Sequence, residues 1–219
     1  MTLANLESFK AAGLALVPIP PDKGKPTKAP RAKGWNLPRA ADNPNGYSAN
    51  LDDFNNTGGY NFGLYHGASN TLALDLDDVE LARKVFEELT DNQLLDWLES
   101  EQRAEVKSPK ANRGKLLFTL PAGFAGAQLR QLKHGAHVVF ELRSGNCQDV
   151  IIGQHPEGGV YQFIGNPKAI PEAPAVLLDM LQHWDAWKPC FDSALGIRAR
   201  TAQNGTTAHT AGRNATRQA

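Results

Sequence analysis

Two aspartates, Asp75 and Asp77, are separated by one residue in the segment LALDLDD at residues 72–78. Side chains two residues apart in a β-strand point to the same face of the sheet, so these carboxylates would project together. Adjacent carboxylates repel each other unless a cation lies between them or one is protonated, and oxygen ligands of this kind suit Mg²⁺ or Mn²⁺. The pattern indicates a divalent-metal site. The alternative is a strand end that exposes its acids to solvent and caps the following helix with Asp78.

A third acid, Glu141, stands in the segment FELR at residues 140–143. In a strand, Phe140 and Leu142 would face one side and leave Glu141 and Arg143 on the other. Arg143 could hold that carboxylate or a phosphate group through two parallel hydrogen bonds. A cross-strand ion pair on a solvated sheet face is the alternative interpretation.

A basic segment lies nearer the N-terminus, where proline, glycine and lysine dominate residues 20–45 and predict a loop. Its basic cluster could follow a nucleic-acid backbone, with a neighbouring aromatic ring to stack on a base. Each lysine taken singly also fits a solvated loop. The cluster and its aromatic neighbour are Lys25, Lys28, Arg31, Lys33 and Trp35.

The elements that must position these residues are strands mixed with helices that do not strictly alternate, which predicts an α+β fold. Helical spacing is expected in 3–12, 79–98 and 173–187, and strands in 14–19, 61–65, 71–77, 105–108, 114–120, 137–143, 148–152 and 160–164. Strands 105–108 and 114–120 are predicted to pair around a turn, and strands 137–143 and 148–152 to form a hairpin. The polar segment 198–219 is predicted to be a flexible tail or linker.

Composition places the chain among ordinary globular proteins, with 41% hydrophobic residues and 23 basic against 23 acidic residues. This balance argues against a protein that coats nucleic acid through a global positive field. The two cysteines form no metal-ligand cluster and predict free thiols in a reducing compartment, so a cytoplasmic location is expected. No signal peptide or membrane-spanning segment is predicted.

Taken together, these segments resemble the archaeo-eukaryotic primase superfamily, specifically the primase-polymerase domain of phages, plasmids and mobile elements. The similarity runs from about Gly13 to Pro167 and rests on the order and spacing of its segments, because an acid pair alone is common. In chain order they are GLALVPIPPDKGKP, KGW, NFGLYHG, LALDLDD, RGKLLFTLP, FELRSG and GQHPEGGVYQFIG.

The resemblance implies that Asp75, Asp77 and Glu141 bind two Mg²⁺ or Mn²⁺ ions, which orient a nucleoside triphosphate and a primer hydroxyl for in-line phosphoryl transfer. The implied activity is template-directed nucleotidyl transfer by a DNA primase/polymerase that makes and extends primers on single-stranded or primed DNA. A helicase domain or protein is left open as a partner, and no membrane is expected.

The fold implied by the resemblance is a primase-polymerase domain over 1–190. An N-terminal αβ unit and basic loop at about 1–60 would pack on an RRM-like antiparallel-sheet catalytic core at 61–190, which ends in a helix.

One departure concerns the triphosphate ligands. The family usually has a histidine in a pattern like Gly-Gly-x-His-aromatic, and this sequence has Arg113-Gly-Lys115-Leu-Leu-Phe there. Lys115 would meet a phosphate as a point charge, or would simply be an exposed strand lysine. His155, in Gly-Gln-His-Pro, matches a family segment Ser-x-His-Pro and could supply the imidazole, or could be solvated. Arg113, Lys115, Arg143 and His155 are thus the implied triphosphate ligands.

Two other functions stay open. One is a replication-initiation or origin-binding module that binds DNA without turnover, which the altered Gly-Lys segment favours. The other is a metal-dependent nuclease that uses the same three acids, which the order of the segments disfavours.

Overall fold

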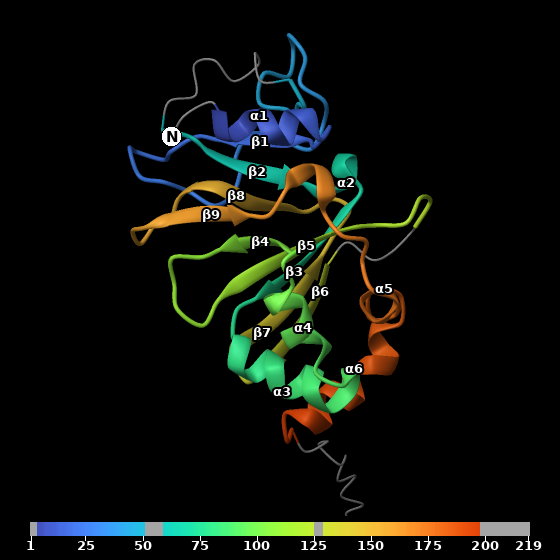
Figure 1. Cartoon of the computed structure of the whole chain (residues 1–219). Coiled ribbons are helices and arrows are strands. Elements are labelled where there is room, and N and C mark those ends of the chain that lie inside the picture. The colour runs from blue at the N-terminus through green and yellow to red at the C-terminus, as the bar shows by residue number, and fades with distance from the viewer. Residues whose placement is uncertain (1–3, 51–58, 125–128, 198–219) are drawn as a thin grey trace, which may run out of the picture.

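Nine strands form one sheet in the computed structural model, which describes residues 4–50, 59–124 and 129–197 (Figure 1). Six α-helices accompany the sheet in these residues, so the predicted α+β class is confirmed. The predicted tail at 198–219 lies outside the described residues. In the described part of the chain, no helix is both long and apolar enough to cross a membrane.

The elements follow one another without regular alternation. The helices are α1 (Ala4–Ala11), α2 (His66–Ser69), α3 (Val79–Thr90), α4 (Gln93–Glu99), α5 (Ala175–Gln182) and α6 (Trp184–Ala194). The strands are β1 (Leu16–Ile19), β2 (Asn61–Tyr65), β3 (Thr71–Leu76), β4 (Ala104–Lys107), β5 (Gly114–Thr119), β6 (Leu129–His134), β7 (His137–Arg143), β8 (Gln148–Gln154) and β9 (Val160–Ile164). Their order in the sheet is β1-β2-β8-β9-β4-β5-β3-β7-β6, and the pairs are antiparallel.

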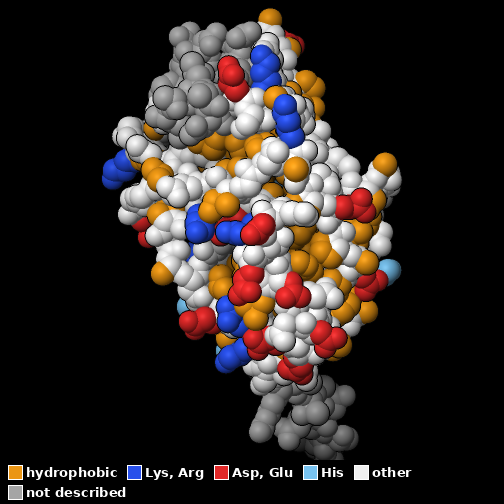
Figure 2. All heavy atoms as spheres, viewed as in Figure 1, with side chains coloured by type: hydrophobic (Ala, Val, Ile, Leu, Met, Phe, Trp, Pro, Cys, Tyr) orange, Lys and Arg blue, Asp and Glu red, His pale blue; other side chains and the backbone are white. Residues whose placement is uncertain are grey.

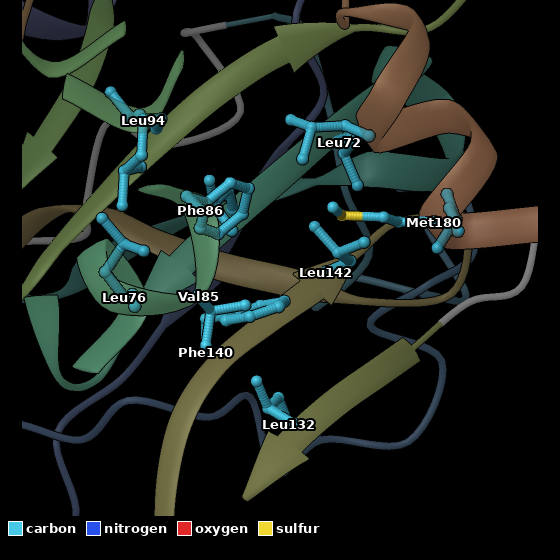
Figure 3. Close-up of a cluster of buried hydrophobic side chains, with 14 of the residues drawn as sticks. Leu72, Leu76, Val85, Phe86, Leu94, Leu132, Phe140, Leu142 and Met180 are labelled. Atoms are coloured by element: carbon cyan, nitrogen blue, oxygen red, sulfur yellow. The ribbon is translucent and has the colours of Figure 1, made fainter. Parts of the chain in front are cut away.

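One face of the β3–β7 region is apolar and is covered by helices α3 to α6. Alternation along β3 places Leu72, Leu74 and Leu76 on this face, beside Phe140 and Leu142 of β7 (Figure 3). Burying each such side chain contributes about 1.5–3 kcal/mol to stability. The residues that alternate with them, such as Asp75 of β3 and Glu141 of β7, therefore point to the other face of the sheet.

That second face is covered along only part of its length. Ala73 of β3 and Leu117 of β5 belong to a separate core with α1, β1, β2 and β8. The next row along the strands holds Asp75 and Lys115. These polar side chains therefore lie at the border between a buried core and the surface.

Two predictions about strand pairing have different outcomes. The β4–β5 pair forms around its turn as predicted. The predicted hairpin of 137–143 and 148–152 is wrong, because β7 pairs with β3 and β6 whereas β8 pairs with β2 and β9. The two strands bury their apolar side chains in different cores, Phe140 in one and Ile151 in the other. The short segment between them thus carries the chain from one part of the sheet to another.

The predicted N-terminal unit shares the sheet with the rest of the domain, since β1 pairs with β2 and β2 pairs with β8. Strand β6 was not expected from the sequence. It is an edge strand with a single fully buried side chain, Leu132, among exposed and half-buried neighbours.

Candidate active site

The three predicted acids lie on one face of the sheet. Asp75 of β3 is the register partner of Glu141 on β7, and directly opposed side chains share a face with their Cβ atoms roughly 4.5–5.5 Å apart. Asp77 follows Asp75 by two residues, and its backbone N–H donates to the Val139 carbonyl at 3.0 Å. The sequence predicted that Glu141 faces away from Phe140 and Leu142, and in the structure Asp75 and Asp77 lie on that same face of the sheet.

Each of these acids is ion-paired with one of the predicted phosphate ligands. Lys115 Nζ lies 3.2 Å from Asp75 Oδ2. Arg113 Nη1 lies 2.7 Å from Asp77 Oδ1, and Arg143 Nη1 lies 2.6 Å from Glu141 Oε2. Three of the four predicted phosphate ligands thus pair with the three predicted acids, one base to each acid. The alternative role of Asp78 is also present, since its side chain accepts from the Leu81 N–H at the start of α3.

A fourth acid, Asp149 of β8, was missed by the sequence analysis. Its carboxylate is buried, accepts hydrogen bonds from Lys115 Nζ and from Arg143 Nε at 3.2 Å, and lies 2.8 Å from His66 Nε2. His66 Nδ1 in turn lies 2.8 Å from Thr71 Oγ1. The signal in the sequence was an acid within the apolar run of β8. The incorrectly predicted β7–β8 hairpin did not bring this acid next to Lys115.

The pKa values in this network are set by burial and by the basic side chains that two acids share, Lys115 and Arg143. Burial raises the pKa of Asp75 to about 6, although Lys115 opposes the shift. Burial would also raise the pKa of Asp149, but Lys115, the His66 hydrogen bond and Arg143 outweigh it and hold that pKa well below its usual range. Burial lowers the pKa of Lys115, and Asp149 and Asp75 together overcome this and bring it to about 12. Asp149 is thus the more firmly ionised of the two acids that share Lys115.

A pocket of about 180 Å³ opens beside these pairs. It lies where the β2–β8 part of the sheet meets strands β3, β4, β5 and β7. Small-molecule sites commonly enclose about 300–1,000 Å³, so a nucleotide would place only part of itself in this space. The lining residues are Lys28, Asp75, Leu76, Asp77, Val106, Ser108, Arg113, Gly114, Lys115, Arg143, Gln148, Asp149, Val150 and Tyr161.

The basic loop reaches this pocket through Lys28. Gln148 Nε2 donates to the Lys28 carbonyl at 2.9 Å. Burial lowers the pKa of the Lys28 ammonium, and Lys110 and Arg113 lower it further. Lys28 is thus a further basic side chain in the pocket wall, together with Arg113 and Lys115.

The other members of the basic cluster stand apart from the pocket. Lys25 and Lys33 are exposed and are not among its lining residues, while Arg31 forms an ion pair with Asp22. The Trp35 ring packs edge-on against Tyr65 at 5.5 Å between ring centroids.

His155 lies behind the pocket rather than on its wall. Its side chain is buried, its Nδ1 accepts from the Glu157 N–H at 3.1 Å, and among the described residues its Nε2 has no hydrogen-bond partner. Burial lowers the pKa of His155, as do Lys28 and Lys110. Its ring lies 5.5 Å from that of Tyr161, which does line the pocket. The neutral imidazole thus keeps one nitrogen available close to the site.

The acids fit Mg²⁺ or Mn²⁺ in donor type and in sharing a face. Their oxygen atoms, however, are turned toward Lys115, Arg113 and Arg143. Across the three described stretches, no group of three or more His, Cys, Asp or Glu side chains is close enough to hold a metal ion. Binding a cation among the acids would therefore require these basic side chains to move.

Comparison with known protein families supplies independent information. Residues 6–176 match the Prim-Pol family, described as bifunctional DNA primase/polymerase, N-terminal. The matched segment contains Asp75, Asp77 and Glu141 together with all of their basic partners. No curated protein matches the chain. The match spans more than half of the 219 residues, and the chain belongs to the Prim-Pol family of bifunctional DNA primase/polymerase N-terminal domains.

Proposed function

We propose that this domain catalyses template-directed nucleotidyl transfer on DNA, making primers and extending them, with Asp75, Asp77 and Glu141 as ligands of Mg²⁺ or Mn²⁺. Membership of the Prim-Pol family supports a DNA primase/polymerase-type function. The observation that carries the finer proposal is the pairing of three acids and three bases on one sheet face. Polymerisation needs both kinds of group at one place, since the acids suit a cation and the bases suit a polyphosphate.

The paired state suggests how the side chains divide the work. Arg113, Lys115 and Arg143 would turn from the carboxylates to phosphate oxygens, with the arginines binding two oxygens each and the lysine acting as a point charge. Asp75, Asp77 and Glu141 would hold the divalent ions, which would supply positive charge against the phosphate chain and the primer 3′ hydroxyl. That hydroxyl would form the new P–O bond at the α-phosphorus as pyrophosphate leaves. The acids and the bases thereby exchange partners, and none of these partly buried charges is left unpaired.

The template would be met by a local surface rather than by the whole molecule. Acidic and basic side chains are interspersed on the face drawn in Figure 2, and acidic ones gather over its lower part, where Figure 1 shows α3 and α4. Because basic and acidic residues are equal in number, the chain has no overall positive charge to attract DNA. The exposed Lys25 and Lys33 of the basic loop are therefore the candidate contacts to single-stranded or primed DNA.

Incorporation of labelled nucleotides tests the proposal. With Mn²⁺, the parent protein should synthesise primers on single-stranded DNA and extend primed DNA. The double variant Asp75→Ala/Asp77→Ala should lose this activity and keep its secondary structure. Glu105→Gln is the matched control, because Glu105 is also a buried carboxylate paired with an arginine, Arg103. Full activity in the double variant would refute the assignment of the acids.

A DNA-binding module without turnover is the second candidate. Lys115, at the position where the family usually has histidine, is bound between Asp75 and Asp149 and partly neutralises a proposed metal ligand. Under this alternative the parent binds DNA in a gel-shift assay and incorporates no nucleotide with either metal.

A further inference from the structure

Asp149 sits beneath the three acid–base pairs and contacts two of the bases. Its carboxylate shares Lys115 with Asp75 and shares Arg143 with Glu141. Lys115 lies closer to Asp149 than to Asp75. Lys115 and Arg143 therefore lie between the more deeply buried carboxylate of Asp149 and the carboxylates of Asp75 and Glu141, which are nearer the surface.

The position of Asp149 is fixed from behind. His66 hydrogen-bonds to Asp149 Oδ2 at 2.8 Å and to Thr71 Oγ1 at 2.8 Å through its other ring nitrogen. All three side chains are buried. A carboxylate held in this way keeps a constant position in the pocket wall relative to β3 and β5, and it cannot reorient without breaking the His66 hydrogen bond.

We propose that Asp149 is a positioning residue that retains Lys115 and Arg143 and thereby leaves Asp75 and Glu141 able to bind a divalent cation; this rests on the proposed function. A buried cation needs a partner. Without the negative charge of Asp149, Lys115 has Asp75 as its remaining carboxylate and Arg143 has Glu141. Lys115 would then close onto Asp75, while Arg143, already 2.6 Å from Glu141, would keep that acid as its one carboxylate partner. Both bases would compete more strongly with the metal ion for these oxygen atoms.

A purely structural role for Asp149 predicts a different outcome. Asp149 connects β8 to β5 and β7, so its loss could loosen the sheet without any specific effect on the acids. A uniform electrostatic effect predicts a third outcome, in which the charges of Asp149 and Lys115 change metal affinity independently. The proposal instead predicts coupling, because Lys115 competes with the metal more strongly when Asp149 no longer retains it.

The test is a titration of the full chain with Mn²⁺ alone, followed by electron paramagnetic resonance. The variants are Asp149→Asn, Lys115→Gln and the two combined. Asp75→Asn identifies the site, and Glu105→Gln is a control on the opposite face of the sheet. Asp149→Asn should weaken Mn²⁺ binding about tenfold, a change of about 1.4 kcal/mol. Lys115→Gln should change affinity less than about threefold in the parent but should restore most of the loss in Asp149→Asn.

The outcomes separate the inference from the proposed function. Unchanged affinity in Asp149→Asn, or equal effects of Lys115→Gln in both backgrounds, overturns the inference alone. A parent that binds no Mn²⁺, or binds it equally well after Asp75→Asn, overturns both the inference and the metal assignment. A parent that binds Mn²⁺ through Asp75 yet incorporates no nucleotide overturns the proposed function, while the inference stands on the affinities.

If Asp149→Asn does not fold, Asp149→Asn/Lys115→Gln is compared with Lys115→Gln. In this pair the remaining effect passes through Arg143, which loses Asp149 and keeps Glu141 as its one carboxylate partner. The double variant should bind Mn²⁺ about threefold more weakly, and equal affinities would overturn the inference.

Discussion

Single side chains on this face are arranged so that charges of opposite sign are in contact. Asp75, Asp77 and Glu141 each meet one base, and Asp149 meets two. Such pairs stabilise the fold little in themselves, because desolvation offsets attraction, but the loss of one partner leaves a buried charge and is costly. The network is therefore a place where single substitutions act on stability and on function together.

Stability should depend on pH through Asp149. Lys115, His66 and Arg143 hold the pKa of the folded-state carboxylate well below its usual value, so its contribution is complete above about pH 4, the unfolded-state pKa, and is lost as pH falls below that. Urea unfolding should show Asp149→Asn less stable than the parent by about 3 kcal/mol at pH 7.

The same comparison should give a smaller difference at pH 3, where the unfolded parent has taken up a proton that the folded parent has not. The comparison is repeated with Asp75→Asn in both proteins. This control removes the titration of Asp75, whose pKa is raised to about 6 and which would also change stability between pH 7 and pH 3. A difference that stays constant between pH 7 and pH 3 would contradict this account of the carboxylate.

At the scale of elements, the basic loop depends on β2 and β8 for its position. Asn61 of β2 donates from Nδ2 to the carbonyls of Thr27 and Gln154, each at 2.8 Å, and accepts from the Gln154 N–H at 2.7 Å. Gly153 makes room for this amide, since its φ is +136° and a Cβ there would lie 2.0 Å from Asn61 Oδ1. The amide thereby fixes the loop residue next to Lys28.

Asn61→Ala should release this part of the loop. Loss of buried hydrogen bonds costs about 1–3 kcal/mol, so trypsin should cleave after Lys28 and Arg31 roughly tenfold faster than in the parent, as measured by mass spectrometry. Asn166→Ala is the control, because its hydrogen bond to the Lys168 N–H lies outside the loop. Equal cleavage rates in the parent and Asn61→Ala would show that the loop is held by other contacts.

The same scale shows what the sequence could predict. Alternation identified β3 and β7, and therefore the faces of Asp75 and Glu141, because apolar side chains must reach the core. The turn-forming residues between β4 and β5 revealed their pairing. Strand order was not recoverable, since alternation shows that a strand has a buried side without naming its partner. Asp149 and His66 were missed for this reason, because the unforeseen β2–β8 pairing brings them together, and Asp149 contacts Lys115 from that position.

At the scale of the whole molecule, the net charge is zero, so binding to DNA must depend on a local group of basic side chains. Lys25 and Lys33 are exposed, and no ion pair within the described residues involves either one. Two phosphate contacts to single-stranded DNA predict a slope of about −1.4 for log K against log salt, at about −0.7 per contact. Fluorescence anisotropy with a labelled oligonucleotide measures this slope.

Lys25→Ala/Lys33→Ala should bring that slope close to zero. The matched control is Lys84→Ala/Lys168→Ala, which removes two exposed lysines from α3 and from the segment after β9. A slope that falls in the control and not in the loop variant would move the template surface away from the basic loop.

The central claim is that three carboxylates on one sheet face hold divalent ions against a polyphosphate. A crystal soaked with Mn²⁺ and a non-hydrolysable nucleoside triphosphate tests it directly through the anomalous scattering of manganese. The account predicts a peak within coordination distance, about 2.0–2.3 Å, of Asp75, Asp77 and Glu141 oxygens, with Lys115 and Arg143 turned to the phosphates. Manganese bound elsewhere, with the three acids still paired to their bases, would contradict it.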